Sequence, residues 1–279
     1  MKSTKLFLAA MLLLAIVSCK KTTSVQAVNL SNAEAANLVT GSLLFGSNGL
    51  GTTFGDALAV SQSLSLNINS TSAALVNSKI ISRHYLKTSV KDVTPLTCGT
   101  TFADTVVREG AVESSDYFAY RTIYNFTLNC NGAIPNSITG TSTFTGNYTG
   151  IYALVTDAGN SNFTVSGLPP ADTALVFSGS YTRSGTFTST IDTTNHGNYN
   201  IAITISKFTV IKPTAHVSST FFAGGSATIS ITGNVAKKGN FSYTGTLVVN
   251  ADGNYTSTLT LAGEAYSVNL LTGLIIKKP

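Results

Sequence analysis

Charged side chains are scarce in this chain, at 10% of its 279 residues, whereas globular proteins average about 25%. The polar surface therefore has to come from Thr, Ser, Asn and Gly, which are abundant throughout the sequence. Thr is favoured on the exposed face of a β-strand, and Asn, Ser and Gly are favoured in turns. The length suits one large domain or two small ones, and nothing in the composition is typical of a soluble cytosolic enzyme.

A concentrated basic face is also missing. The formal net charge is +5, but the densest basic clusters are three separate pairs, Lys20-Lys21, Lys237-Lys238 and Lys277-Lys278. Recognition of a phosphate backbone requires many basic side chains on one face. We therefore expect no nucleic-acid partner.

Few titratable groups could carry catalysis. The only histidines are His84, His196 and His216. His196 lies in a turn-like stretch, which favours a solvated loop position, and the other two have no Asp or Glu at a suggestive local spacing. A triad assembled from distant residues stays open, although no G-x-S-x-G motif supports one. We predict no enzymatic activity, no catalytic residue and no cofactor.

One acidic cluster is present, made of Asp104, Glu109, Glu113 and Asp116. Paired carboxylates and calcium sites both require several oxygens close together. The Asp-rich loop spacing of a calcium site is missing, so a solvated hairpin tip around Gly110 is the favoured interpretation. We expect no metal site.

The apolar run at the N-terminus is too short to span a bilayer. Lys2 and Lys5 are followed by about a dozen mostly apolar residues, Leu6 to Val17, and then by the small Ser18. A spanning helix needs roughly 20 apolar residues. A basic segment, a short apolar segment and a small residue are instead the parts of a secretory signal, which predicts a signal peptide over residues 1–18.

The residue after the predicted cut is Cys19. Ile16, Val17 and Ser18 fill the three positions before it, and the group resembles the bacterial lipobox. The resemblance implies cleavage between Ser18 and Cys19, a diacylglyceryl group on the Cys19 thiol, and acylation of the new N-terminus. Two or more acyl chains anchor a protein stably, whereas one binds only marginally. An ordinary signal peptide with a chance cysteine is the alternative.

Only Cys98 and Cys130 remain after the anchor cysteine. In an oxidising compartment, two otherwise lone cysteines favour a disulfide. A zinc site would require about four ligands, and no histidine lies near either cysteine. Two buried free thiols are the alternative.

The N-terminal part of the mature chain is expected to be helical. Residues 19–28 form a lipidated cysteine and a short polar tether. Ser31 and Glu34 have the spacing of a capping box, and apolar residues follow at helical spacing, which predicts a helix from about Asn32 to Leu44. Four glycines then predict a flexible segment: Gly46, Gly49, Gly51 and Gly55. A phosphate-binding loop is the alternative, but no phosphate-loop motif accompanies them.

Residues 56–86 give mixed signals. Leu64, Leu66 and Ile68 alternate like a strand, whereas Ala73, Val76, Ile80 and His84 are spaced like a helix. We predict a short strand followed by a helix.

From about residue 90 onward, apolar residues recur with a period of two, as in β-strands. The longest stretch, Tyr117 to Cys130, predicts one strand with an aromatic face, on which Thr122 is the only polar residue and Cys130 is included. Shorter alternating stretches predict further strands around residues 163–165, 175–181, 199–205, 229–231, 241–249, 259–261 and 268–270. After Ile205 the apolar positions change from odd to even residue numbers, beginning with Phe208. This change predicts a one-residue β-bulge near Lys207.

A weak repeat occurs three times. Two glycines six residues apart are followed by a polar residue and an aromatic, at Gly140 and Gly146, at Gly179 and Gly185, and at Gly233 and Gly239. Arg183 and Lys237 occupy matching places in the last two copies. We predict that each copy marks a hairpin tip, where glycine supplies a positive φ.

The C-terminal region predicts three strands joined by tight turns, over residues 241–250, 254–262 and 265–271. The start Ser-Cys-Lys-Lys, the Thr/Ser/Asn/Gly-rich body and the closing Tyr-Ser-Val-Asn-Leu-Leu-Thr-Gly pattern resemble outer-membrane lipoproteins of the Bacteroidota type, a family of unknown function. Surface-exported members usually carry acidic residues just after the lipidated cysteine. Lys20-Lys21-Thr22-Thr23 has none, which favours the periplasmic face of the outer membrane.

The expected fold is mainly β, a large antiparallel meander that forms a curved sheet, a sandwich or a partly open barrel, with one or two N-terminal helices. Residues 29–279 are expected to form a single domain, helical over about 31–86 and a sheet over about 90–277. The expected function is a non-catalytic binding or structural module of the cell envelope that meets another envelope protein. A periplasmic carrier of lipid or another apolar ligand is the alternative, and an envelope hydrolase is less favoured.

Overall fold

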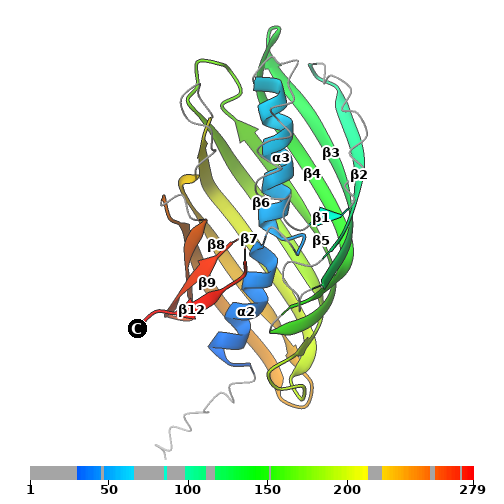
Figure 1. Cartoon of the computed structure of the whole chain (residues 1–279), viewed down its shortest axis with the longest axis vertical. Helices are drawn as coiled ribbons and strands as arrows, with labels where there is room; N and C mark the ends of the chain where they lie inside the picture. Colours follow the sequence, from blue (N-terminus) through cyan, green and yellow to red (C-terminus); the bar gives the residue numbers. More distant parts are fainter. Residues whose placement is uncertain are drawn as a thin grey trace, which may run out of the picture.

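The computed structural model describes residues 30–44, 47–65, 85–86, 98–110, 117–150, 152–212, 222–251, 255–270 and 272–279. These residues form one antiparallel sheet in which each strand pairs with the next one along the chain, from β1 to β12. The sheet is strongly curved and does not close, because β1 and β12 lie at its two opposite edges (Figure 1). The predicted antiparallel meander is therefore confirmed.

The sheet is built from eleven strands of three or more residues and the two-residue β1. The bounds are β1 Tyr85–Leu86, β2 Thr101–Gly110, β3 Tyr117–Asn131, β4 Ile134–Thr149, β5 Ala153–Ser166, β6 Ala174–Ser189, β7 His196–Ile211, β8 Phe222–Val235, β9 Gly239–Val249, β10 Thr256–Leu261, β11 Glu264–Asn269 and β12 Ile275–Lys277.

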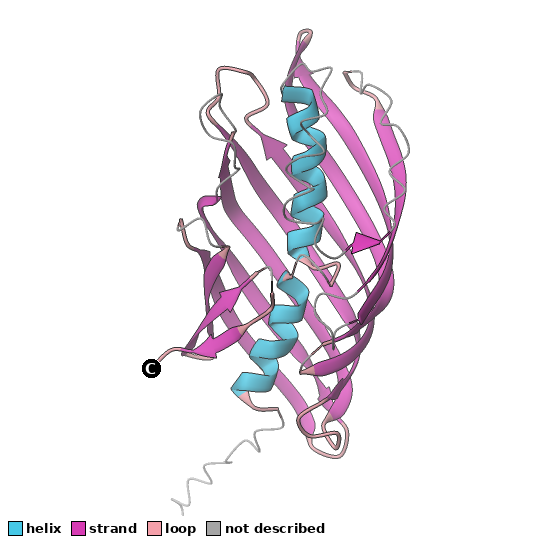
Figure 2. Ribbon diagram, viewed as in Figure 1, coloured by secondary structure: helices cyan, strands magenta, loops and turns pink. Residues whose placement is uncertain are grey.

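Two helices fill the concave side of this sheet. α2, Asn32–Leu43, and α3, Leu50–Ser65, lie nearly end to end against the inner face (Figures 1 and 2). α2 begins where the sequence predicts, because the Ser31 hydroxyl accepts from the Glu34 amide and the Glu34 carboxylate accepts from the Ser31 amide. This capping box satisfies amide groups that have no partner within the helix.

The prediction for the glycine-rich segment was wrong. Gly51 and Gly55 lie inside α3, and residues 64–65 belong to this helix rather than to a strand. Glycine costs a helix about 1 kcal/mol relative to alanine, but burying one Phe or Leu side chain contributes about 1.5–3 kcal/mol. Phe54 and Leu58 are both buried against the sheet, so tertiary packing overrides the local preference. The predicted helix over residues 73–84 lies outside the described residues.

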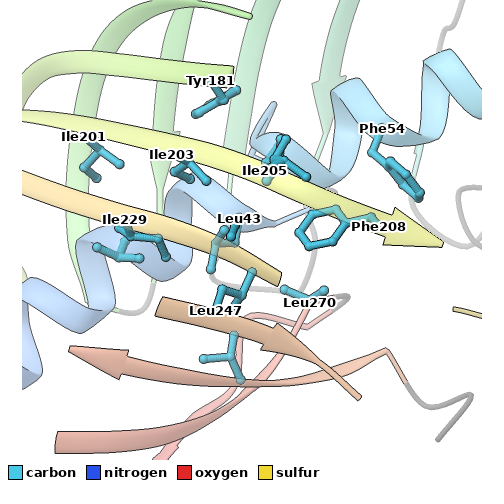
Figure 3. Packing of buried hydrophobic residues seen from close by; sticks show 14 of the residues in the cluster. Leu43, Phe54, Tyr181, Ile201, Ile203, Ile205, Phe208, Ile229, Leu247 and Leu270 are labelled. Carbon is cyan, nitrogen blue, oxygen red and sulfur yellow. The ribbon is translucent and has the colours of Figure 1, made fainter. Parts of the chain in front are cut away.

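The inner face of the sheet carries the core, as the alternating pattern predicts. β3 runs as one strand, and Phe118, Tyr120, Tyr124, Phe126 and Leu128 are buried on its inner face. Figure 3 shows how apolar side chains of later strands meet both helices, including Leu43 of α2 and Phe54 of α3. The predicted bulge is present, since the pairing of β7 with β8 shifts between Ile205 and Lys207.

The repeated glycines have a different role from the predicted one. Only the third copy contains a hairpin tip, where Lys237 has φ 64° and Gly239 has φ 103°. Both glycines of the first two copies lie inside strands β4 and β6. They belong to two rows that cross the inner face, in which large residues alternate with glycine: Tyr120, Gly146, Asp157, Gly185, Tyr199, Gly233 and Phe241 in one, and Phe126, Gly140, Phe163, Gly179 and Ile205 in the other.

Because large residues alternate with glycine, each large side chain can occupy the space above the neighbouring glycine. A Cβ added to Gly146 would lie 2.3 Å from the Tyr120 ring, and one added to Gly140 would lie 2.3 Å from the Phe163 ring. Glycine at such positions also permits strong curvature of a sheet. In the first two copies, the six-residue spacing is thus the distance along a strand between two glycine rows.

The C-terminal strands follow the prediction closely. β9, β10 and β11 pair in order, and β12 adds an edge strand beside β11. α2 contacts β10, β11 and β12, so the sheet curls around the first helix. Within the described ranges, neither helix is long and apolar enough to cross a membrane.

The predicted disulfide is present. Cys98 and Cys130 are bonded, with their Cα atoms 5.7 Å apart and a sequence separation of 32. The bond joins the residues before β2 to the end of β3, where the Gly99 amide also donates to the Leu128 carbonyl. The covalent link and this hydrogen bond hold the β2 side of the sheet to β3.

Replacing both cysteines with serine should lower the free energy of unfolding by roughly 3–4 kcal/mol, because the open chain has more conformational freedom when unfolded. Urea unfolding of the oxidised protein, the reduced protein and the double variant would measure this change. The reduced protein and the double variant should agree, and equal stability of all three would contradict the prediction.

Candidate functional site

The predicted lipidation and cleavage residues, Ser18 and Cys19, lie outside the described residues. His84 and His216 lie outside them too, whereas His196 is exposed at the start of β7, as its turn-like sequence suggests. Asp104 and Glu109 project from opposite faces of β2, because they differ in parity along the strand. In the described part of the chain, no three His, Cys, Asp or Glu side chains come close enough to hold a metal ion.

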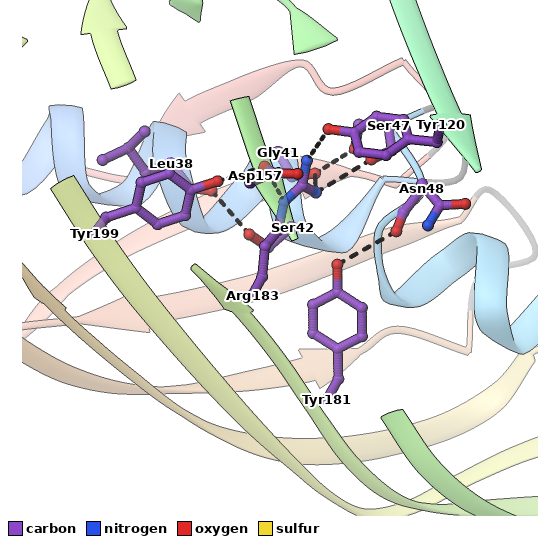
Figure 4. A network of polar contacts seen from close by, with 10 residues as sticks. All are labelled: Leu38, Gly41, Ser42, Ser47, Asn48, Tyr120, Asp157, Tyr181, Arg183 and Tyr199. Carbon is purple, nitrogen blue, oxygen red and sulfur yellow. Dashed lines mark hydrogen bonds and ion pairs between the residues drawn. The ribbon is translucent and has the colours of Figure 1, made fainter. Parts of the chain in front are cut away.

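A buried polar network lies where the two helices meet the sheet (Figure 4). Its centre is Arg183 of β6, whose side chain is 1% exposed. The Arg183 Nε donates to the Asp157 carboxylate of β5 at 2.5 Å. The Tyr199 hydroxyl of β7 donates to the same carboxylate oxygen at 2.6 Å, and Arg183 Nη2 donates to the Tyr120 hydroxyl of β3.

The same guanidinium also holds the helices. Arg183 Nη1 donates to the carbonyl oxygens of Gly41 and Ser47, each at 3.1 Å. Gly41 lies in the last turn of α2, and Ser47 lies just before α3. Carbonyls at the C-terminal end of a helix have no partner within the helix, and a cation there is favoured by the helix dipole. Arg183 therefore links three strands to the junction between the two helices.

The glycine row makes this network possible. Asp157 and Gly185 face each other across β5 and β6, and a Cβ on Gly185 would lie 2.5 Å from the Asp157 Cβ. A side chain at this position would displace the carboxylate that Arg183 binds. The sequence repeat and the buried network are therefore parts of one packing arrangement.

A second arginine binds α3 directly. Arg108 of β2 donates through Nη2 to both carboxylate oxygens of Asp56, at 2.6 and 2.7 Å. The Tyr124 hydroxyl of β3 donates to Asp56 as well. Between the two arginines, Asn48 accepts from the Thr122 hydroxyl at 2.9 Å and from the Tyr181 hydroxyl at 3.3 Å. The polar residue predicted on the apolar face of β3 thus binds the helix junction.

The environment keeps these tyrosines neutral. Burial raises the pKa of Tyr120, Tyr124, Tyr181 and Tyr199 above the ordinary value for a phenol, because a phenolate would lose its hydration there. Phenols with a raised pKa stay un-ionised at neutral pH and can donate hydrogen bonds. The network is therefore suited to holding the helices in place rather than to acid–base chemistry.

The remaining space beside this network is small. A cavity of about 30 Å³ lies between α2 and the sheet, next to Arg183 and Tyr199. This volume has room for about one water molecule, whereas pockets for small ligands measure about 300–1,000 Å³. Where α2 meets the sheet, the helix occupies the space that an apolar ligand would need.

The convex face of the sheet has a different character. Neighbouring strands align uncharged polar residues in rows that cross many strands, and none of the members of one such row is buried: Asn125, Thr141, Asn162, Ser180, Thr204, Thr228, Thr246 and Thr260. A shallow hollow of about 550 Å³ opens over its first five members, with the backbone of Gly140 and Gly179 as part of its floor. The convex face therefore offers a dense array of hydroxyl and amide groups.

The two arginine centres were missed by sequence reasoning, although a signal was available. Arg183 shares the inward parity of Tyr181 and Phe187, and Arg108 shares that of Val106. Burying a charge at an inward position costs free energy unless the charge is paired. Each arginine therefore implied a buried carboxylate. The sequence does not say which carboxylate, since Asp56 is 52 residues away from Arg108.

Comparisons with protein-family models, with curated proteins and with solved structures found no match for this chain.

Proposed function

We propose that this chain is a bacterial envelope lipoprotein whose β domain acts as a non-catalytic binding module. The anchor would be the acyl groups on Cys19, which follow from the lipobox-like residues Ile16, Val17 and Ser18. The Cys98–Cys130 disulfide supports an extracytoplasmic location, because such bonds persist in oxidising compartments. The absence of acidic residues after Cys19 favours the periplasmic face of the outer membrane.

The observation that carries the proposal is that the two faces of the sheet differ: helices cover the inner face, and the convex face is exposed. The inner face is occupied by α2 and α3, which Arg183 and Arg108 bind to the strands. The convex face is then the surface on which another envelope component can bind, and the row from Asn125 to Thr260 is neutral and rich in hydroxyl and amide groups. Such groups both donate and accept hydrogen bonds.

The chemistry of this surface favours a neutral, hydroxyl-rich partner such as the glycan strands of an envelope polysaccharide. The hollow over Thr141, Asn162 and Ser180 carries no charged residue in its lining. A charged partner would lose hydration there without gaining an opposite charge. A glycan exchanges hydrogen bonds with water for hydrogen bonds with Thr, Ser and Asn side chains.

The alternative function, a carrier of lipid or another apolar ligand, is less well supported than a binding module, because helices fill the inner face. For this alternative, α2 would have to leave the sheet and break the contacts of Arg183 with Gly41 and Ser47. Mass spectrometry of lipids extracted from the purified protein distinguishes the two functions. Stoichiometric lipid beyond the anchor would favour the carrier.

Co-sedimentation of the purified protein with isolated cell-wall sacculi tests the binding proposal. Replacing Thr141 and Ser180 with Glu should weaken binding at least about tenfold, because each buried, unpaired charge costs more than 1.4 kcal/mol. The matched control replaces Ser242 and Thr244 with Glu. Both residues are exposed on β9 away from the hollow, so this variant should bind as the wild type does. Equal binding by the wild type and both variants would reject the hollow as the binding surface.

A further inference from the structure

The first described residues of the chain are held at one end of the sheet. Leu30 is 1% exposed, and its carbonyl accepts from the Tyr243 hydroxyl of β9. Glu34, in the first turn of α2, accepts from Asn195 Nδ2 at 2.6 Å. Asn195 in turn accepts from Lys238. The chain therefore enters the domain between the β6–β7 turn, residues 190–195, and the β8–β9 turn, residues 236–238.

The length of the preceding segment limits which part of the domain can reach a membrane. Cys19 is eleven residues before Leu30, and eleven residues extend to at most about 40 Å. As a flexible chain they would span roughly 18 Å. The 16-residue strands are about 50 Å long, so the turns at the far end of β6 and β7 are beyond the usual reach of a lipid anchored at Cys19.

The near end carries side chains that suit a lipid surface. Ile191, in the β6–β7 turn, is 67% exposed, the largest exposure among the large exposed apolar residues that the structure describes. Lys237 and Lys238 lie in the adjacent turn, where Lys237 is exposed and Lys238 is 3.8 Å from the Asp192 carboxylate. An apolar side chain beside lysines is the composition of segments that lie at the interface of a bilayer.

The charges at this end also set an orientation. Exposed Glu109 lies at the same end but on the β2 side of the sheet, because β2 ends where β3 begins. Anionic headgroups repel the Glu109 carboxylate, whereas on the β6–β9 side Lys237 and Lys238 balance the carboxylates of Glu34 and Asp192. The β6–β9 side should therefore lie closest to the lipid.

We propose that the β6–β7 and β8–β9 turns rest on the bilayer, with Ile191 at the level of the headgroups and Lys237 and Lys238 near lipid phosphates. This proposal rests on the lipid anchor of the proposed function. It places the long strands upright on the membrane, with the disulfide end farthest from it. The convex face then stays accessible to a polymer that runs parallel to the membrane.

The absence of tryptophan from the chain provides a direct test. In the lipidated full-length protein, Ile191→Trp places the only tryptophan of the chain at the proposed contact, where it can be excited apart from the tyrosines. The matched control is Ile134→Trp, because Ile134 is 59% exposed and begins β4 at the opposite end of the sheet. Both variants are bound to vesicles of phosphatidylethanolamine and phosphatidylglycerol, with and without bromine on the acyl chains.

Brominated lipid should quench the fluorescence of the Ile191→Trp protein severalfold and leave that of the Ile134→Trp protein unchanged. Flotation of the vesicles reports the anchor separately. Proteins that float without quenching at position 191, or with equal quenching at both positions, would overturn the orientation and leave the anchor intact. Proteins that fail to float would overturn the lipid anchor and the orientation together.

Discussion

Replacing Arg183 with Met should lower the free energy of unfolding by about 3–5 kcal/mol, the usual cost of removing one partner of a buried ion pair. The substitution leaves the Asp157 carboxylate without its cation at a position where the side chain is fully buried. It also removes the donor for the carbonyl oxygens of Gly41 and Ser47. Both losses act on the contact between the helices and the sheet.

Guanidinium unfolding followed by circular dichroism would measure the effect. The matched control is Lys277→Met, since Lys277 pairs with Glu264 at 2.8 Å on the surface, with its side chain 59% exposed. Surface pairs contribute about 0–1 kcal/mol, so this variant should unfold almost as the wild type does. A change below about 1 kcal/mol for Arg183→Met would show that the network does not hold the helices.

A second variant distinguishes charge from packing. Replacing Arg183 and Asp157 together with Met and Leu removes both charges, and such exchanges of a whole buried pair are often neutral or stabilising. Here the double variant should recover only part of the loss, because Tyr199 and the helix carbonyls still lack their partners. Full recovery would assign the whole cost to the unpaired carboxylate.

Replacing Phe54 with Ala should lower the free energy of unfolding by about 3–5 kcal/mol. Phe54 is the aromatic residue of α3 that enters the inner face, 2% exposed. Its ring meets Phe177 edge-on at 4.8 Å between centroids and Phe208 at 6.1 Å. Deleting the ring removes both contacts and leaves a cavity between α3 and the sheet.

Urea unfolding of the Phe54→Ala protein would measure this loss, with Val248→Ala as the control because Val248 is 47% exposed on β9. An exposed substitution of this kind should change stability by less than about 0.5 kcal/mol. Binding of a small apolar probe such as benzene to Phe54→Ala alone would show that the helix fills the inner face. A loss no larger than that of the control would indicate that α3 packs only loosely on the sheet.

Local patterns predicted the elements whose stability is local or periodic. Ser31 and Glu34 predicted the start of α2, because a capping box depends only on residues three apart. Alternation predicted β3 and the later strands, because a sheet with one buried face forces a period of two. The shift after Ile205 predicted the bulge for the same reason. The pairing of Cys98 with Cys130 followed from the small number of cysteines.

The failures share one cause, which is that the deciding contact is distant in sequence. Gly51 and Gly55 predict a flexible segment, but Phe54 between them packs against Phe177 and Phe208, more than a hundred residues later. Gly146 and Gly185 suggest turns, yet the rings and carboxylates of neighbouring strands occupy the space above them. Arg183 is the only charged residue of β6, and only the fold brings Asp157, Gly41 and Ser47 to it.

The sequence by itself determined the class of fold, the period-two core and the disulfide partners, because each depends on composition or on neighbouring residues. The lipid anchor at Cys19 stays a prediction. Only the tertiary structure decided that the inner face is occupied by helices, that two buried arginines hold them there, and that the chain enters beside Ile191 and Lys238. These features depend on the register and curvature of many strands, which bring together residues that lie far apart along the chain.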